Sequence, residues 1–483
     1  MNLNVKRTGI VLKPNPGRVL FRPLNFLGEH RPLRIISRVL SLTEDEVSEM
    51  LSQVTAEFQP RHQKLIDFLL HRFAQVQHMV PTDQPLTRNR QLLIGSYFTH
   101  EYSLEAAALF NPSLIPDPDQ SNLPAGVLRF ILSLRATGEG HISSITFRTG
   151  TIDAAGAIRV DVPTPFVSLP DLVPDASYEK ALFSRKLREL GLVDRVPETI
   201  LKNLGDTFTI EQLTKEISFL RRYVSHATED FDRSARQVLM LAQSNYQISY
   251  SPNQPISERV IFPNGPNELN GIEDARFVRF VDDDGSVTYL ATYTAYDGRV
   301  TIPQLLETRD FLHFHISTLN GPEVQNKGMA LFPRRIRGQY ATLSRQDGEN
   351  LYIMYSDDLH FWYTKELLLK PSHPWEFLQI GNCGSPIATD DGWLILTHGV
   401  GPMRKYSIGA ILLDRDNPSH VIGRLRDPLL CPDETEREGY VPNVVYSCGA
   451  LVHNGLLILP YAMSDTASSF ATVPLGELLA AMK

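Results

Sequence analysis

The chain has 483 residues, 42% of them hydrophobic and 21% charged, which is ordinary for a folded protein with a large core. A formal net charge of −8 excludes the basic footprint of a nucleic-acid-binding protein, so an anionic substrate would need a local basic pocket. No apolar run resembles a signal peptide or a membrane-spanning helix, and the three widely spaced cysteines fit neither a disulfide framework nor a zinc site. We therefore expect a cytoplasmic protein without a membrane, nucleic-acid or metal partner.

The N-terminal part, residues 1–88, is predicted to be a largely helical extension. Apolar side chains recur at helical spacing across residues 41–80. Thr43 and Glu46 form the capping-box pattern that starts the first of these helices, and Pro81 helps to close the segment.

A sequence pattern typical of β-strands begins near residue 90, where short apolar runs are separated by Pro, Asn, Asp and Gly. We place the first part of a β domain at 89–175 and its remainder at 245–483. Between them, residues 176–244 return to helical periodicity, and Thr209 with Gln212 marks a second capping box. A helical insertion therefore interrupts the β domain.

The C-terminal half repeats a pattern in which an apolar strand is followed closely by a polar residue. Recurring strand units joined by turns are typical of a β-propeller, whose inner strands direct side chains to a central cavity. The irregular spacing also allows a sandwich. The repeated strands are residues 289–295, 351–356, 393–397 and 456–461, and the polar residues are Asp297, Asp357, His398 and Asp465.

The segment NGIEDAR places Glu273, Asp274 and Arg276 just before the alternating run 277–281. A glycine followed by acids at the start of a strand predicts a tight turn that presents carboxylates at the end of a sheet. Asp274 could serve there as a proton donor for a carbohydrate substrate. Alternatively, Asp274 and Arg276 share one face of the strand and could form a simple ion pair.

A second group of residues could bind an anion. Lys327 and Arg345 are cations, while His398 and Tyr406 can supply further donors, and such charge-assisted donors suit a phosphate. Alternatively, Lys327 and the arginines of the LFPRRIR run belong to a solvated basic loop.

Together these segments resemble glycoside hydrolase family 130, which comprises β-mannoside phosphorylases and related β-mannosidases. The similarity covers roughly residues 90–175 and 245–480. It implies a mainly β fold, a five-bladed β-propeller, to which the N-terminal helical segment and the helical insertion are additions. Its markers are Asn111-Pro112, the LRA step at Arg135, GIEDAR, LFPRRIRGQYATLSR, YSDDLHFW, THGVG, YSIGAILLD, GYVPNVVYSCG and LPYAMSD.

The resemblance also implies roles for individual residues. Asp274 matches the catalytic acid of the family. The sugar would be held by Asn111, Arg135 and Asp465, to which we add Glu273, Arg276 and Asp357, and phosphate by Lys327, Arg345, His398 and Tyr406. Three departures concern this site: Ala275 stands where proline is usual, Lys327 where arginine is common, and Ser344-Arg345-Gln346 where the family has histidine, arginine and proline.

The activity implied is inverting phosphorolysis of a β-mannoside to α-mannose 1-phosphate and a shortened acceptor, with phosphate as co-substrate and no cofactor. Inverting hydrolysis normally uses two carboxyls about 6.5–9.5 Å apart, whereas phosphate is itself an anionic nucleophile and needs cations rather than a base. The resemblance implies that Asp274 donates its proton through the mannosyl 3-hydroxyl. We therefore expect enclosure and Glu273 to raise the pKa of Asp274 against the influence of Arg276.

Two alternatives remain open at this stage. An inverting β-mannosidase on the same fold could use Glu436 or Glu438 as the base for water, and a non-catalytic protein could bind sugar without turning it over. The helical additions could pack on the propeller rim, narrow the acceptor side or mediate formation of a homo-oligomer. Neither the glycosidic linkage nor the acceptor follows from the sequence.

Overall fold

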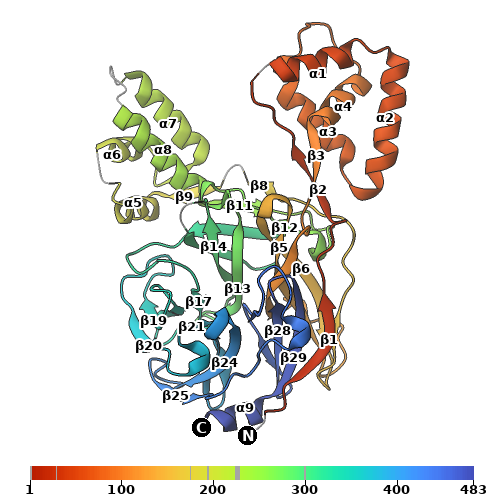
Figure 1. Ribbon diagram of the computed structural model, residues 1–483. Coiled ribbons are helices and arrows are strands. Elements are labelled where there is room, and N and C mark those ends of the chain that lie inside the picture. Colours follow the sequence, from red (N-terminus) through yellow and green to blue (C-terminus); the bar gives the residue numbers. More distant parts are fainter. Residues whose placement is uncertain (1–2, 29, 174–175, 193–194, 224–228, 299–300) are drawn as a thin grey trace.

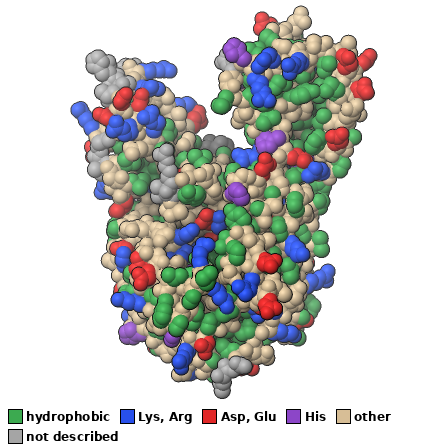
Figure 2. Space-filling view, viewed as in Figure 1, with side chains coloured by type: hydrophobic (Ala, Val, Ile, Leu, Met, Phe, Trp, Pro, Cys, Tyr) green, Lys and Arg blue, Asp and Glu red, His purple; other side chains and the backbone are tan. Residues whose placement is uncertain are grey.

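A body of antiparallel sheets carries two helical lobes on one edge, and the two ends of the chain lie close together at the opposite edge (Figure 1). Figure 2 shows a deep notch between the two lobes. Among the described residues, no helix combines the length and apolar character needed to cross a membrane. The computed structural model describes residues 3–28, 30–173, 176–192, 195–223, 229–298 and 301–483.

In the described part of the chain, five antiparallel sheets have four or more strands, and each forms one blade of a propeller. The blades are numbered in chain order. Blade 1 contains β4 (Ala108–Pro116), β5 (Leu128–Thr137), β6 (Ser143–Ile152), β7 (Ile158–Val160) and β12 (Val260–Ile261). Blade 2 contains β13 (Ile272–Val281), β14 (Val287–Tyr296), β15 (Thr301–Thr308) and β16 (His313–Thr318), extended by β11 (Tyr246–Ser249) and β8 (Asp171–Leu172).

The other three blades follow without interruption. Blade 3 contains β17 (Ala330–Leu331), β18 (Tyr340–Ser344), β19 (Leu351–Ser356) and β20 (Glu366–Leu369). Blade 4 contains β21 (Gln379–Asn382), β22 (Ile387–Thr389), β23 (Gly392–Val400), β24 (Tyr406–Leu413) and β25 (Val421–Arg424). Blade 5 contains β26 (Val445–Tyr446), β27 (Leu451–His453), β28 (Leu456–Met463) and β29 (Ala467–Pro474), and α9 (Leu475–Met482) follows it.

Apolar clusters fill the gaps between neighbouring blades and close the ring. Phe147 of blade 1 packs against Phe277 of blade 2, and Phe130 of blade 1 packs against Phe470 of blade 5. Similar clusters join blades 2 and 3, blades 3 and 4, and blades 4 and 5. Because both faces of each blade are covered, the strands read as nearly continuous apolar runs. The predicted five-bladed propeller is confirmed.

The first residues of the chain belong to the propeller rather than to a helical extension. Strand β1 (Lys6–Leu12) pairs antiparallel with β29, so the two ends of the chain close blade 5 together. The Arg7 guanidinium donates to both carboxylate oxygens of Glu436, each at 2.9 Å. The predicted boundary missed this strand because its pairing partner lies at the far end of the sequence, where no local pattern can indicate it.

The N-terminal lobe consists of four helices on a stalk made by β2 (Val19–Pro23) and β3 (Thr99–Ser103). Thr43 and Glu46 make the predicted capping box at the start of α2. The last helix of the lobe runs past residue 88, and blade 1 begins only at Ala108. The helices are α1 (His30–Leu40), α2 (Glu44–Phe58), α3 (Leu65–Val76) and α4 (Arg88–Tyr97).

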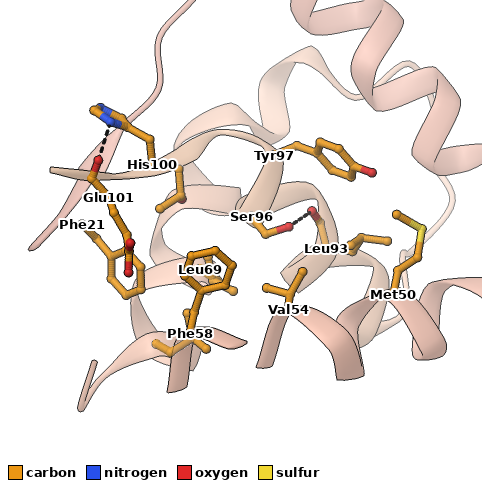
Figure 3. Close-up of a pocket in the computed structure, with 12 residues that line it drawn as sticks. Phe21, Met50, Val54, Phe58, Leu69, Leu93, Ser96, Tyr97, His100 and Glu101 are labelled. Atoms are coloured by element: carbon orange, nitrogen blue, oxygen red, sulfur yellow. Dashed lines mark hydrogen bonds between the residues drawn. The ribbon is translucent and has the colours of Figure 1, made fainter. Parts of the chain in front are cut away.

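Within this lobe, α2, α3, α4 and the stalk surround a cavity of about 460 Å³ (Figure 3). Most of its wall is apolar, including Met50, Phe58, Leu69 and Leu93, whereas Glu101 is one of the few polar residues at its edge. The Glu101 carboxylate is already engaged by His62 at 2.8 Å and Arg61 at 3.1 Å. The cavity therefore has a mainly apolar wall, and its Glu101 carboxylate is already paired.

The insertion lobe is anchored to the outer edges of blades 2 and 3. Arg185 donates to Asp358 at 2.7 Å, and buried Lys186 donates to Asn245 Oδ1 at 2.7 Å. Burial lowers the pKa of Lys186 to about 7. These contacts fix the base of the lobe on the rim. Its elements are β9 (Ser177–Glu179), α5 (Lys180–Glu189), α6 (Arg195–Lys202), β10 (Thr207–Thr209), α7 (Ile210–Tyr223) and α8 (Glu229–Gln243).

Candidate active site

One end of the propeller brings together residues from all five blades. In each blade the start of the first strand lies beside the turn between two later strands. Thus Phe110 near the start of β4 pairs with Arg135 near the end of β5, and Ile272 at the start of β13 pairs with Ala295 near the end of β14. The same antiparallel register applies around the ring, so the turns and strand starts surround a common mouth.

Two β-bulges direct polar side chains into this mouth. The strand register shifts between Phe110 and Ser113 on β4, and again between Glu273 and Arg276 on β13. Asn111 and Asp274 lie within these bulges with φ angles of 50° and 52°, a left-handed conformation that costs energy for residues other than glycine. The Asn111 amide donates to Asp274 Oδ1 at 2.5 Å. Both strands therefore hold a strained residue at the point where the two side chains meet.

Two cations, one on another strand and one in a connecting loop, bind the adjacent carboxylates. Arg135 on β5 donates to Glu273 at 3.0 Å and lies 3.5 Å from Asp274 Oδ1. Lys327, in the connection before β17, donates to the second oxygen of Glu273 at 3.2 Å. The predicted sugar residues Asn111, Arg135 and Glu273 thus join Asp274 in one network with Lys327.

The expected direction of the Asp274 pKa shift is wrong in this structure. Burial alone would raise the pKa of this carboxyl, but the charges of Arg135, Arg276 and Lys327, together with the Asn111 hydrogen bond, lower it to about 2. The expectation from the sequence considered only the charges of Glu273 and Arg276. Arg135 and Lys327, which are distant in sequence, also lower the pKa of Asp274.

Asp465 is the carboxyl of the mouth whose pKa is raised. It lies with Ser464 in the turn between β28 and β29, and both residues have left-handed φ angles, of 51° and 46° respectively. Burial, and then the charge of Asp274, raise the pKa of Asp465 to about 6 against the opposing influence of Arg135. The mouth therefore pairs an ionised carboxyl with one that holds its proton more tightly.

Arg276 lies beneath the mouth rather than within it. Its side chain is 1% exposed and donates to the Tyr446 hydroxyl at 2.7 Å, to the Cys383 carbonyl at 3.0 Å and to the backbone carbonyl of Asp274 at 3.0 Å. Through these hydrogen bonds Arg276 supports the bulge from beneath. Its contact with substrate stays a prediction.

The predicted phosphate residues Arg345, His398 and Tyr406 form a second group at the same end of the propeller. The side-chain amide of Gln379 lies 3.1 Å from His398 Nε2, and its oxygen accepts from both His398 Nε2 and Arg345 when the amide is oriented to satisfy its neighbours. The rings of His398 and Tyr406 stack with centroids 5.9 Å apart. Burial, followed by the charges of Arg345 and Arg276, lowers the pKa of His398 well below its usual value.

This second group retains unused polar atoms. Arg345 Nε and His398 Nδ1 are buried and have no hydrogen-bond partner among the described residues. Arg345 Nε is therefore a buried donor that is available to a ligand of the mouth.

Two glycines make room for this group. A Cβ atom at Gly381 would lie 2.5 Å from His398 Cε1 and 2.8 Å from Arg345 Cδ, and one at Gly328 would lie 2.7 Å from Arg345 Nε. Sequence reasoning did not identify Gln379, Gly381 or Gly328. No motif or periodic pattern in the sequence marks these three residues.

Other predicted residues lie elsewhere. Asp357 is exposed on the turn after β19, where it accepts a hydrogen bond from Gln339 at 3.1 Å, and the structure does not bring it into the mouth network. Glu436, a candidate base for hydrolysis, is 3% exposed and bound by Arg7 and by the Tyr461 hydroxyl at 2.6 Å. It cannot activate water because its carboxylate is enclosed in this structural network. Glu438 is exposed.

Comparisons with known proteins agree with this arrangement. A family model described as beta-1,4-mannooligosaccharide phosphorylase matches residues 233–483. A 1,2-beta-oligomannan phosphorylase from Thermoanaerobacter sp. (strain X514) is 36% identical over 219 residues, which cover 44% of this chain and 71% of that protein. A beta-1,4-mannooligosaccharide phosphorylase from Ruminococcus albus is 32% identical over 42% of this chain and 62% of its own length.

Among solved structures, a beta-1,2-mannobiose phosphorylase from Listeria innocua in complex with beta-1,2-mannobiose superposes with a TM-score of 0.47 and 20% identity. The superposition covers 79% of this chain and 93% of that one.

Proposed function

The chain belongs to glycoside hydrolase family 130, and from this premise we propose that it is an inverting β-mannoside phosphorylase. It would use inorganic phosphate to cleave a β-mannoside into α-mannose 1-phosphate and a shortened acceptor. The observation that carries this proposal is the placement of a cationic, partly unsatisfied group, Arg345 with His398, at the same mouth as Asp274.

The terminal mannose would occupy the network around the two bulges. Asn111, Arg135 and Asp465 offer amide, guanidinium and carboxyl groups, which can bind several hydroxyls of one sugar. Because the bulge backbone is strained and fixed by Arg276, these groups are held in place before the sugar arrives.

Phosphate would bind beside the sugar and next to His398, where Arg345, Lys327 and Tyr406 supply donors. Lys327 would exchange part of its ion pair with Glu273 for the incoming anion. A phosphate oxygen would then form a bond to the anomeric carbon as the glycosidic C–O bond breaks. No carboxylate base is needed because the nucleophile is already anionic.

The pKa of Asp274 is low in this structure, and it has to rise before this residue can donate a proton. Phosphate brings negative charge next to the cations that stabilise the Asp274 carboxylate, and Lys327 in particular is shared between the two. Binding of the anion therefore raises the pKa of Asp274 and favours proton uptake. In our proposal the proton reaches the leaving oxygen through the mannosyl 3-hydroxyl.

The direct test is incubation with β-1,2- and β-1,4-linked mannosides, each with and without phosphate, followed by assay of α-mannose 1-phosphate and free mannose. We expect mannose 1-phosphate to form only when phosphate is present. Release of free mannose at the same rate without phosphate would contradict the proposal and favour a hydrolase. Both linkages belong in the panel because the relatives named above act on different ones.

A further inference from the structure

Two exposed aromatic side chains from different blades meet at the rim of the mouth. Tyr440 lies in the loop before β26 and is 56% exposed, and exposed His141 lies in the turn between β5 and β6. Their ring centroids are 5.6 Å apart with an interplanar angle of 31°, and the Tyr440 hydroxyl lies 3.4 Å from His141 Nδ1. We call this pair the rim platform.

The backbone places the rim platform directly beside the sugar network. The amide of Tyr440 donates to Thr466 Oγ1 at 2.8 Å, and Thr466 follows Asp465 in the chain. On the other side, His141 is in the turn that follows the strand carrying Arg135. The exposed platform therefore bridges the two loops that carry or adjoin Asp465 and Arg135.

Both loops are held rigidly. A Cβ atom at Gly439 would collide with the Ser464 carbonyl, and one at Gly138 would collide with the Tyr102 hydroxyl, so each loop packs closely on its support. His141 has a φ angle of 61°, a strained conformation maintained by these surroundings. The two rings are thus positioned in advance, which limits the entropy lost on binding.

The chemistry of the pair suits a sugar. Tyrosine and histidine combine an apolar ring with a polar tip, and a pyranose combines a face of C–H groups with hydroxyls at its edge. Exposed aromatic rings beside a polar cavity gain stability when a ligand removes their faces from water. Because the mannosyl unit that is transferred would fill the inner network, the unit next to it lies at the rim.

We infer that Tyr440 and His141 form the binding platform for the acceptor sugar, the part of the β-mannoside that leaves after phosphorolysis. This inference rests on the proposed function, because it assumes that the donor mannose occupies the inner network. It assigns the leaving sugar to the side of the mouth between blades 5 and 1.

The test uses the synthetic direction, in which donor and acceptor are separate molecules. With α-mannose 1-phosphate as donor and β-mannobiose as acceptor, Tyr440→Ala should raise the KM for the acceptor about 10-fold. The KM for α-mannose 1-phosphate should stay within about 2-fold. Tyr440→Phe retains the ring and should bind the acceptor nearly as well as the parent protein. Tyr97→Ala, which removes an exposed tyrosine from the N-terminal lobe, is the matched control.

An unchanged KM for the acceptor in Tyr440→Ala would contradict the role of the rim platform. An equal rise in the KM for the acceptor and the KM for α-mannose 1-phosphate would also contradict it. If the parent protein makes no product from α-mannose 1-phosphate, the proposed activity fails but the platform is still testable. Calorimetric titration with β-mannotriose should then show about 10-fold weaker binding for Tyr440→Ala than for the parent protein. Equal binding, or no binding by the parent protein, would count against the platform.

Discussion

The propeller mouth and the cavity of the N-terminal lobe are both concave, but they differ in chemistry. The mouth has bulged strands with left-handed residues, and buried polar atoms such as Arg345 Nε lack partners. The cavity is lined mainly by apolar side chains such as Leu69, and its Glu101 carboxylate is paired. The mouth therefore combines backbone strain with polar groups available to a ligand, whereas the cavity offers a mainly apolar surface.

The strongest test of this contrast is Asp274→Asn, which leaves the shape of the mouth but removes the proton donor. We expect kcat for phosphorolysis to fall about 10³-fold, within the range for loss of a general acid. Steady-state assays of mannose 1-phosphate would measure the loss, and calorimetry should show that the sugar still binds. A variant with normal turnover would exclude Asp274 as the acid.

Arg345→Leu tests the cationic half of the mouth. Loss of a charge-assisted donor should raise the KM for phosphate about 10- to 100-fold while changing the KM for the mannoside much less. The matched control is Arg334→Leu, since Arg334 is exposed and stacks over Trp393 instead. Equal effects of the two substitutions on phosphate KM would show that Arg345 has no special role.

Leu69→Ala tests the cavity of the N-terminal lobe. Leu69 is 1% exposed and lines the lobe cavity, so its truncation should cost about 2–5 kcal/mol of local stability. We expect a lower unfolding temperature by calorimetry with kcat unchanged within about 2-fold. Leu27→Ala is the control, because Leu27 is fully exposed. A large loss of kcat at assay temperatures where the variant is folded would link the lobe to catalysis.

Asp465→Asn should make the stability of the protein less sensitive to pH. Because its pKa is about 6 in the folded protein, above the ordinary value of 3.8, the folded state binds more protons than the unfolded state between these values. The stability contributed by this group is therefore present at low pH and lost as the pH rises through about 6.

Asparagine does not ionise, so the Asp465→Asn variant does not lose stability as the pH rises through about 6. Its free energy of unfolding should exceed that of the parent protein by about 1–3 kcal/mol at pH 7.5, and the two should be equal near pH 4. Unfolding transitions recorded at the two pH values would measure it. Asp357→Asn, at an exposed turn, is expected to show no such difference. A gain for Asp465→Asn that is equal at both pH values would contradict the assignment.

Glu438→Gln has the smallest expected effect. Glu438 is exposed, and the proposed phosphorolysis needs no carboxylate base, so kcat should change less than about 2-fold. Assays with and without phosphate would measure it. Abolished turnover would instead support a hydrolase in which Glu438 activates water.

Local features of this protein were predictable from its chain. The capping box of Thr43 with Glu46 depends on residues three apart, and the repeated strands are short apolar runs between turn residues, so both could be recognised without tertiary information. The resemblance to a known family implied the five-bladed propeller, which the structure confirms, and it predicted roles for Asp274 and for the cationic group. Short-range chemistry and family motifs thus sufficed for the fold class, and they named most of the residues that the structure brings together at the mouth.

Only the tertiary structure decided the electrostatics and the closure of the ring. Asp274 has a lowered pKa because Arg135 and Lys327 approach it from strands and loops that are distant in sequence. Strand β1 completes blade 5 through pairing with the opposite end of the chain, and Glu436 is enclosed because of that pairing. Charge interactions and strand pairing depend on distance in space, and a linear pattern does not contain this information.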